Sequence, residues 1–516
     1  MLNTVRYAAA SLAGSVLIGA STLPGATTPA ELDRCVAAHV ALSKQTLPAV
    51  CDDAVFQRRV YLDLTGLLPE PDVARRFLDD GSPDKRRALI EALLASPAHA
   101  DYQTLRWLDL LRVKSEFPAN LWPNAVQAYA RLIRENVGTN QTYAAFAREL
   151  LTSSGSNFRD PAVNFFRALP QKDAPHIAAF VAQSLLGIRY ETLPAEAQRD
   201  LALVFSGVDY KATTEWKEEI VFFNPAKVDP ALRALRFPDG KRARCAPGAD
   251  PRPLFAAWLT APDNPYFARC MANRIWFHLM GRGIVHEADD LHPGNPPANP
   301  ALLELLEKAF RESRYDLHAL YRLILNSKTY QAESAAPPDA LAARIGYAYY
   351  QTRQLDAEVL LDILCQITGT TESYSSQIPE PYTSFTESHA VRIGDGSVTS
   401  PFLELFGRPP RDTGLLSERA NGPSTAQRLH LLNASHIQDK LRRPPLFGEF
   451  RRKRERHGPT AQPLEELYLL TLSRLPTPEE RRTVMLYTQA CGGPGHEVAQ
   501  DVLWALVNTK EFCVRR

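Results

Sequence analysis

The chain has 516 residues, of which 45% are hydrophobic and 23% charged, and its 59 basic and 58 acidic side chains leave a formal net charge of +1. This length allows two to four domains, each able to bury a core. A dedicated nucleic-acid-binding protein would carry a clear basic excess, so the composition predicts no nucleic-acid partner. Since prolines outnumber glycines, 40 to 26, we expect many short helices that end at rigid turns.

The first residues have the order of a secretory signal peptide. Arg6 precedes the uncharged run "YAAASLAGSVLIGASTL", and a segment rich in small residues follows. This order predicts a signal peptide over residues 1–26 and an exported protein, periplasmic or extracellular. An uncleaved membrane anchor is the alternative, although the run is slightly short for a span. No later stretch is apolar enough to cross a membrane, so we expect no transmembrane span after signal cleavage.

One sequence pattern occurs near both ends of the chain. "YLDLTGLLPEP" at residues 61–71 and "YLLTLSRLPTPE" at residues 468–479 each start with tyrosine and place Pro-x-Pro at the same offset. In both places the apolar residues have helical spacing, and we expect the prolines to stop the helix. The sequence therefore predicts one unit of helix, proline turn and helix, used at both ends. The alternative is chance, because apolar helices with proline turns are common.

Helical spacing continues through most of the chain between these copies. "EIVFF" is the clearest candidate for a short strand, and "FPDGKRARCAPGADPRP" has the turn residues of a linker. The predicted fold class is mainly α, a multi-helical two-domain protein with short irregular or β segments. Its predicted parts are an N-terminal helical domain over residues 30–235, a linker over residues 236–252 and a C-terminal helical domain over residues 253–516.

The seven cysteines carry no recognisable metal or haem motif. Without a C-x-x-C sequence there is no signal for a zinc ribbon, a thioredoxin-like site or c-type haem attachment, and we expect no haem. An odd number of cysteines leaves at least one thiol unpaired. Cys35 with Cys51 and Cys491 with Cys513 are close enough in sequence to form disulfides, or the cysteines serve as small buried hydrophobic residues.

Several long segments resemble a known family. "RRVYLDLTGLLPEPDVARRFL" and "SPDKRRALIEALLASPAHADY" resemble the first of two paired domains of unknown function found in exported planctomycete-type, cytochrome-associated proteins. "FAAWLTAPDNPYFARCMANRIWFHLMGRGIV" and "FGRPPRDTGLLSERANGPSTAQRLHLLN" resemble the second. The resemblance covers nearly the whole mature chain and implies an exported, mainly helical protein without an established activity. Many relatives carry a C-x-x-C-H haem-type motif or a cytochrome module, and its absence here argues against electron transfer.

A helix and the loop that follows it supply the first group of candidate site residues. Arg274 and His278 are one turn apart in "NRIWFHLMGRG" and therefore share a helix face. If that face meets Asp289 or Asp290 of the loop "HEADDLHPGNPPANP", an arginine–aspartate pair forms beside a histidine with a shifted pKa. The alternative is a buried salt-bridge network that only holds the loop to the helix.

The same loop is a candidate metal site. His286, Asp289 and His292 lie within seven residues, and imidazole and carboxylate groups together can hold zinc, manganese or calcium. The alternative is a shaped structural turn with solvated side chains. The only cofactor that the sequence suggests is thus a divalent metal at these residues.

A second loop and helix supply the remaining candidates. "GRPPRDTGLLSERANGPSTAQRLHLLN" contains Arg411, Glu418, Arg419, His430 and Asn433. Arginines beside a glutamate can hold an anionic group through paired hydrogen bonds. We expect both groups of candidates to form one buried polar hub in the C-terminal half of the chain.

These features favour a structural or binding component of the cell envelope, with envelope proteins or extracellular polysaccharide as partners. The first alternative is an enzyme or accessory factor that acts on extracellular acidic or sulfated polysaccharide through the polar hub. The second is a redox accessory protein that lacks haem. Because G-x-S-x-G, H-E-x-x-H and phosphate-binding glycine loops are all absent, no catalytic residue is assigned.

Overall fold

The computed structural model describes residues 27–42, 44–230, 232–334, 344–376, 378, 387–420, 422–442, 463–491 and 495–516. The predicted signal peptide at residues 1–26 lies outside the described residues.

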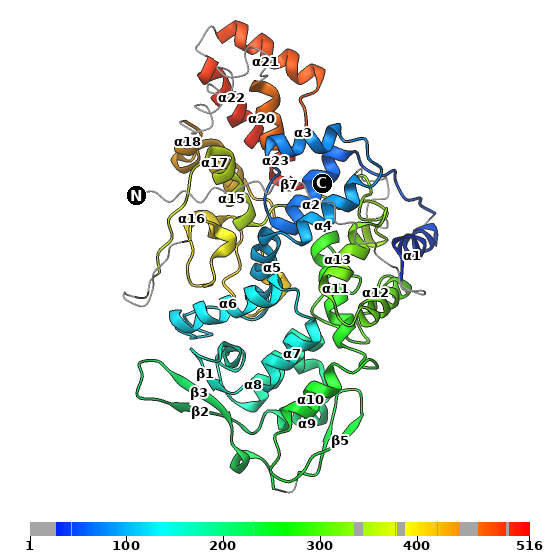
Figure 1. Ribbon diagram of the computed structural model, residues 1–516, viewed down its shortest axis with the longest axis vertical. Helices are drawn as coiled ribbons and strands as arrows, with labels where there is room; N and C mark the ends of the chain where they lie inside the picture. Colours follow the sequence, from blue (N-terminus) through cyan, green and yellow to red (C-terminus); the bar gives the residue numbers. More distant parts are fainter. Residues whose placement is uncertain are drawn as a thin grey trace.

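Helices form most of the described chain, which confirms the predicted mainly α class (Figure 1). Those of the first half are α1 (Pro29–Leu42), α2 (Asp53–Thr65), α3 (Pro71–Asp79), α4 (Lys85–Leu94), α5 (Pro97–Leu110), α6 (Pro123–Gly138), α7 (Tyr143–Thr152), α8 (Ala174–Val181), α9 (Ala195–Val204) and α10 (Arg252–Leu259). Those that follow are α11 (Phe267–Met280), α12 (Pro300–Glu312), α13 (Leu317–Leu325), α15 (Ala357–Thr368), α16 (Pro401–Leu405), α17 (Thr425–Asn433), α18 (Ser435–Arg442), α20 (Pro463–Leu472), α21 (Pro478–Cys491), α22 (Gly495–Val507) and α23 (Lys510–Cys513).

The strands are short and form small antiparallel sheets. They are β1 (Gly155–Ser156), β2 (Val208–Ala212), β3 (Glu219–Phe223), β4 (Ala234–Arg236), β5 (Arg242–Arg244), β6 (Arg353–Gln354) and β7 (Val514–Arg515). The predicted strand "EIVFF" is β3, which lies between β1 and β2. β4 pairs with β5, of which only β5 lies fully inside the segment predicted to be a linker. β7 joins the C-terminal residues to β6.

Prolines begin helices in this protein more than they end them, which corrects the predicted helix stops. α2 ends at Thr65 because Gly66 adopts the left-handed backbone conformation at φ 65°, three residues before the first proline of "LLPEP". The second proline of that motif, Pro71, is the first residue of α3. A proline at the first helical position loses nothing, because its missing N–H would have had no partner within the helix. Likewise, Pro97 begins α5, after α4 has ended at Leu94.

The repeated unit is present at both ends of the chain as α2–α3 and α20–α21, and the two copies touch. α3 packs against α20, and Glu465 of α20 binds Arg75 of the first copy at 3.0 Å and Arg481 of the second at 2.8 Å. The unit is therefore also a contact between the two ends of the chain.

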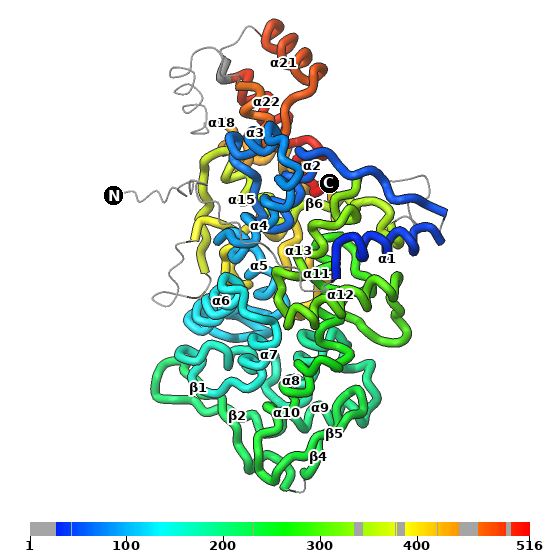
Figure 2. The backbone as a smooth tube through the Cα atoms, turned by 45° about the vertical axis from the view of Figure 1, so that its right-hand side comes forward, coloured from blue at the N-terminus to red at the C-terminus, as the bar shows by residue number. Residues whose placement is uncertain are grey.

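Both predicted domains contribute to both clusters of buried apolar side chains. The first cluster contains residues from Leu32 to Tyr350, and the second contains residues from Leu62 to Phe512. Figures 1 and 2 show the C-terminal residues beside α2, which contacts β7. Segments from opposite ends of the sequence thus meet in the upper half of the molecule.

Two further findings concern the cysteines and the membrane. All seven cysteines are described, and all are free thiols, most of them buried, so neither candidate disulfide is formed. Among the described residues, no helix has both the length and the apolar character needed to cross a membrane.

Candidate functional site

A cleft of about 880 Å³ lies where α5, α11, α17 and the β6–β7 sheet meet. Asp356 is the only carboxylate among the described residues that line it. We call this feature the cationic cleft after its basic lining residues, which are Arg106, Arg353, Arg419, Arg428, Lys510 and Arg515.

Asp356 organises one wall of the cationic cleft from the N-terminal end of α15. Its Oδ2 accepts hydrogen bonds from the Tyr102 hydroxyl at 2.8 Å, from Arg106 Nη2 at 2.6 Å and from Arg515 Nη2 at 2.9 Å. Burial would raise the pKa of this carboxyl group, but Arg106, Arg515 and Arg419 hold it well below its ordinary value. Asp356 is therefore ionised at neutral pH and fixes two of the arginines that line the cleft.

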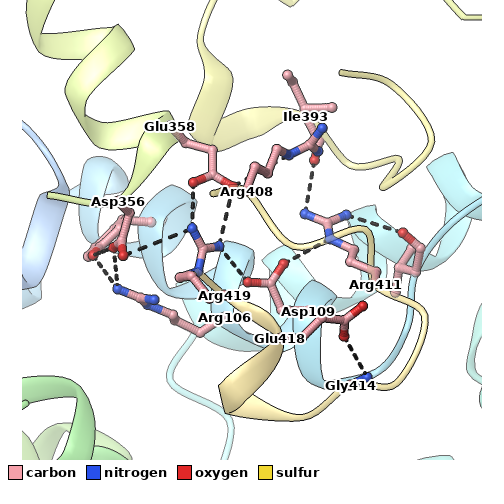
Figure 3. A network of polar contacts seen from close by, with 12 residues as sticks. Arg106, Asp109, Asp356, Glu358, Ile393, Arg408, Arg411, Gly414, Glu418 and Arg419 are labelled. Carbon is pink, nitrogen blue, oxygen red and sulfur yellow. Dashed lines mark hydrogen bonds and ion pairs between the residues drawn. The ribbon is translucent and has the colours of Figure 1, made fainter. Parts of the chain in front are cut away.

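A second group of ion pairs continues from this wall into the protein (Figure 3). Arg419 donates to Glu358 Oε2 and to Asp109 Oδ2, each at 2.6 Å, and Arg411 donates to Asp109 Oδ1 at 2.9 Å. Burial would raise the pKa of Asp109, but Arg419 and Arg411 lower it overall. Glu358 is fully buried and also lies 3.4 Å from Arg408 Nε. Arg411 and Arg419 are thus held by Asp109 and Glu358, two acids that the sequence did not single out.

Glu418, which the sequence places beside these arginines, contacts the loop backbone instead. Its carboxylate accepts hydrogen bonds from the backbone N–H groups of Asp412, Thr413 and Gly414, at 2.7, 3.2 and 3.1 Å. It thus shapes the loop that carries Arg411 and Arg419 and forms no ion pair with either arginine among the described residues.

The predicted pair of Arg274 and Asp289 is present and links the two groups of candidates. Arg274 Nε donates to Asp289 Oδ1 at 3.0 Å, and both side chains are buried. Asp289 Oδ2 accepts the backbone N–H of Leu416 at 2.7 Å, three residues before Arg419. Asp290 is not part of this pair and instead lies 3.5 Å from Arg189. The structure therefore brings Arg274, Asp289, Arg411 and Arg419 into one polar region.

His278 lies in the lining of the cationic cleft, one helical turn after Arg274. Its Nε2 is buried, and it has no hydrogen-bond partner within the described part of the chain. Burial and, next, the positive charge of Arg106 hold the pKa of His278 well below its ordinary value of 6.5. His278 is therefore uncharged at neutral pH.

The predicted metal ligands do not converge. Asp289 is occupied by Arg274, His286 Nε2 lies 3.7 Å from Glu287, and His292 Nε2 lies 3.6 Å from Asp290. Across the described ranges, no group of three or more histidine, cysteine, aspartate or glutamate side chains is arranged to hold a metal ion. The sequence brings these residues close along the chain, but their side chains point to different partners.

His430 and Asn433 are not in the lining of the cationic cleft. The His430 ring packs against Phe402, Phe406 and His436, with ring centroids 5.6, 6.1 and 5.9 Å apart. Asn433 is exposed at the end of α17. These two residues lie outside the polar hub that the sequence predicted.

Five charged residues of this region were not predicted from the sequence, namely Arg106, Asp109, Asp356, Glu358 and Arg515. One signal was available, because "LRWLDLL" places Arg106 and Asp109 among apolar residues of an amphipathic helix, where a charged side chain needs a partner. The partners come from segments more than 200 residues away in the sequence, and no local pattern identifies them.

Two family models match the chain. One, described as PSCyt2, a protein of unknown function (DUF1549), matches residues 31–190. The other, described as PSD1, a protein of unknown function (DUF1553), matches residues 251–488. No curated protein and no solved structure matches the chain. The first matched segment supplies Arg106, and the second supplies Arg353, Arg419 and Arg428. Residues of both matched segments therefore line the cationic cleft.

Proposed function

This chain belongs to the family in which a PSCyt2 domain precedes a PSD1 domain, and we propose that it is an exported binding component of the cell envelope that holds an acidic or sulfated polysaccharide in the cationic cleft. The charge of the cleft carries this proposal: six basic side chains line it, against one carboxylate. Guanidinium groups bind carboxylate and sulfate groups through paired, charge-assisted hydrogen bonds.

The positive charge of the cleft remains when the carboxylates behind its lining are included. Asp63, Asp109 and Glu358 lie next to the lining arginines and raise the number of acids to four, against the six basic residues. An anionic ligand would restore the balance, whereas a neutral ligand would leave the excess uncompensated.

The basic residues of the cleft form two groups, which differ in burial and in ion pairing. Arg106, Arg419 and Arg515 are buried or nearly so and are held by carboxylates, so their remaining N–H groups keep fixed directions. Arg428 and Lys510 are exposed at the rim, and within the described ranges neither forms an ion pair. We therefore expect the rim to attract the polymer and the floor to orient its acidic groups.

The size of the cleft favours a segment of polymer over a single small anion. Ligand sites commonly measure about 300 to 1,000 Å³, and this cleft lies towards the upper end of that range. It can hold several groups in a row, each with its own acidic substituent.

Removing both rim charges is expected to weaken polymer binding. In the Arg428→Ala/Lys510→Ala double variant of the full chain, we expect the Kd for dextran sulfate or polygalacturonate to rise about tenfold at low salt. The dependence of the Kd on salt should also become shallower, because fewer counterions are released. Titration calorimetry with each polymer measures both effects, and the two polymers distinguish sulfate from carboxylate recognition.

Arg87→Ala is the matched control, because this exposed arginine on α4 does not line the cleft. It should bind both polymers like the wild type. The proposal fails if neutral dextran binds as tightly as dextran sulfate, or if the double variant binds like the wild type.

Catalysis in the same cleft is the second candidate function, and His278 is the observation that favours it. An uncharged imidazole beside an anion-binding surface can accept a proton from a bound sugar. If the protein cleaves the polymer, wild type incubated with polygalacturonate will release new chain ends, and His278→Gln will release none while its Kd is unchanged. Absence of new chain ends with the wild type on both polymers rejects this function and leaves binding.

A further inference from the structure

An exposed tryptophan stands at the tip of the hairpin formed by β2 and β3. Trp216 lies between the two strands and is 63% exposed. In Figures 1 and 2 this hairpin extends from the lower end of the molecule, away from α15, α17 and the C-terminal residues. Single exposed apolar side chains are normal on a protein surface, so the residues that surround this indole decide whether it forms part of a site.

Trp216 is part of a small cluster that contains another indole and a cation. The rings of Trp216 and Trp122 have centroids 6.4 Å apart and planes at 81°. Lys217 Nζ lies 4.9 Å from the Trp122 ring centroid and 5.2 Å from that of Trp216. We call Trp122, Trp216 and Lys217 the platform.

The backbone of the platform adopts conformations that side chains other than glycine rarely take. Lys217 has φ 61° and Trp122 has φ 71°. Such conformations are unfavourable and persist when the surroundings hold them in place. They are frequent at ligand-binding sites, so two of them in one exposed cluster favour a functional explanation.

Buried polar side chains hold the hairpin tip in place. Glu218 is buried and accepts hydrogen bonds from Ser156 Oγ at 2.6 Å and from Thr213 Oγ1 at 2.7 Å. Asn157, which is fully buried, donates to the Lys217 carbonyl at 3.2 Å and accepts the Glu219 N–H at 2.8 Å. The backbone that carries Trp216 is thus held in place before any ligand arrives, so little backbone entropy remains to be lost on binding.

The charges around the platform leave a positive excess. Arg159 lies 3.1 Å from Glu215 and 3.8 Å from Glu218, so the carboxylates nearest to the tip have a basic partner. Glu219, which follows Glu218 in the hairpin, binds both Arg167 and Lys172 at 2.7 Å, and Asp209 in β2 binds Lys227 at 2.6 Å. In the described part of the chain, Lys217 and Lys211 have no such acidic partner, so the surface beside the exposed indole is complementary to an anion.

We propose that the platform is a second binding site for an acidic sugar residue, which stacks on the Trp216 indole and places its carboxylate or sulfate against Lys217. An indole offers the apolar, polarisable surface that the C–H groups of a sugar ring contact, and the ammonium group adds the charge selection. The choice of an acidic sugar rests on the proposed function, while the location of the site rests on the hairpin alone. A polymer that reaches both sites gains affinity, because its second contact is intramolecular.

The test compares the full-length wild type with Trp216→Ala and Lys217→Asn, using polygalacturonate as the probe. Asparagine accepts the left-handed backbone conformation, so Lys217→Asn removes the amine without changing the hairpin. We expect each variant to raise the Kd about tenfold and to keep the thermal midpoint of the wild type, because both side chains are exposed. The wild type should show a fluorescence change on binding that Trp216→Ala lacks.

Met485→Ala is the matched control, since Met485 is an exposed apolar residue on α21 and 54% accessible. It should bind polygalacturonate like the wild type. Equal Kd values for the wild type and Trp216→Ala would overturn the proposal, whatever the cleft variants do. Loss of binding in Trp216→Ala but not in Arg428→Ala/Lys510→Ala would support the platform and reject the cationic cleft, so the two proposals fail separately.

Discussion

Arg419→Ala is expected to lower the free energy of unfolding by about 3–5 kcal/mol, the cost of breaking a buried ion pair from one side. Arg419 is 9% exposed and is the shared partner of Glu358 and Asp109. Its removal leaves the fully buried Glu358 side chain with Arg408, at 3.4 Å, as its remaining basic partner among the described residues. Asp109 keeps Arg411, so the larger part of the loss arises at Glu358.

Urea denaturation monitored by circular dichroism measures this change directly. Arg428→Ala is the control from the same cleft, because Arg428 is exposed and forms no ion pair within the described residues; its effect should stay within about 0.5 kcal/mol. If Arg419→Ala is as stable as Arg428→Ala, the ion pairs of Figure 3 do not hold these segments together.

Asp356→Asn is expected to have an effect of similar size, about 3–5 kcal/mol, for the opposite reason. The neutral amide leaves Arg106 and Arg515 close together without the charge that both of them bind. An asparagine oxygen can still accept hydrogen bonds, but without a negative charge it cannot compensate two guanidinium groups. Asp439→Asn on α18, where the side chain is 70% exposed, should leave stability unchanged.

The same carboxylate gives a pH dependence with a definite sign. The pKa of Asp356 is lower in the folded protein than its ordinary value of 3.8, so on acidification the unfolded chain takes up the proton first. The stabilisation by Asp356 is therefore complete above this ordinary pKa and is lost as the pH falls from there through the folded pKa. Denaturation at a series of pH values should show a shallower acid loss for Asp356→Asn than for the wild type. Parallel curves for the two proteins would contradict this role.

The fold class could be predicted because helical periodicity and turn residues are local. Spacing of apolar residues located α2 and α20 at the two repeats, and a β-branched and aromatic run located β3. Helix ends were less accurate, because proline both stops one helix and begins the next. In the first copy of the repeat, Pro71 begins α3, and the preceding helix α2 is ended by Gly66 instead of by a proline.

The candidate site could be predicted in part. Two segments with many polar residues could be identified from the sequence. One contains the pair of Arg274 and Asp289, and the other contains Arg411 and Arg419. Nothing local distinguishes Asp356 or Glu358 from the many acids that simply begin a helix. Their importance comes from the arginines that the fold places beside them.

By itself, the sequence determined that this protein is built from short helices with rigid turns and that its family pairs two domains. The first property depends on residues a few positions apart, where backbone sterics and helical spacing act directly. The second rests on two long matched segments, residues 31–190 and 251–488. Only the tertiary structure decided where the charges meet. The cationic cleft joins α5, α11, α15, α17 and the C-terminal strand, and the partner of a buried charge depends on which segments pack together. Electrostatic complementarity is a property of that packing and has no signature along the chain.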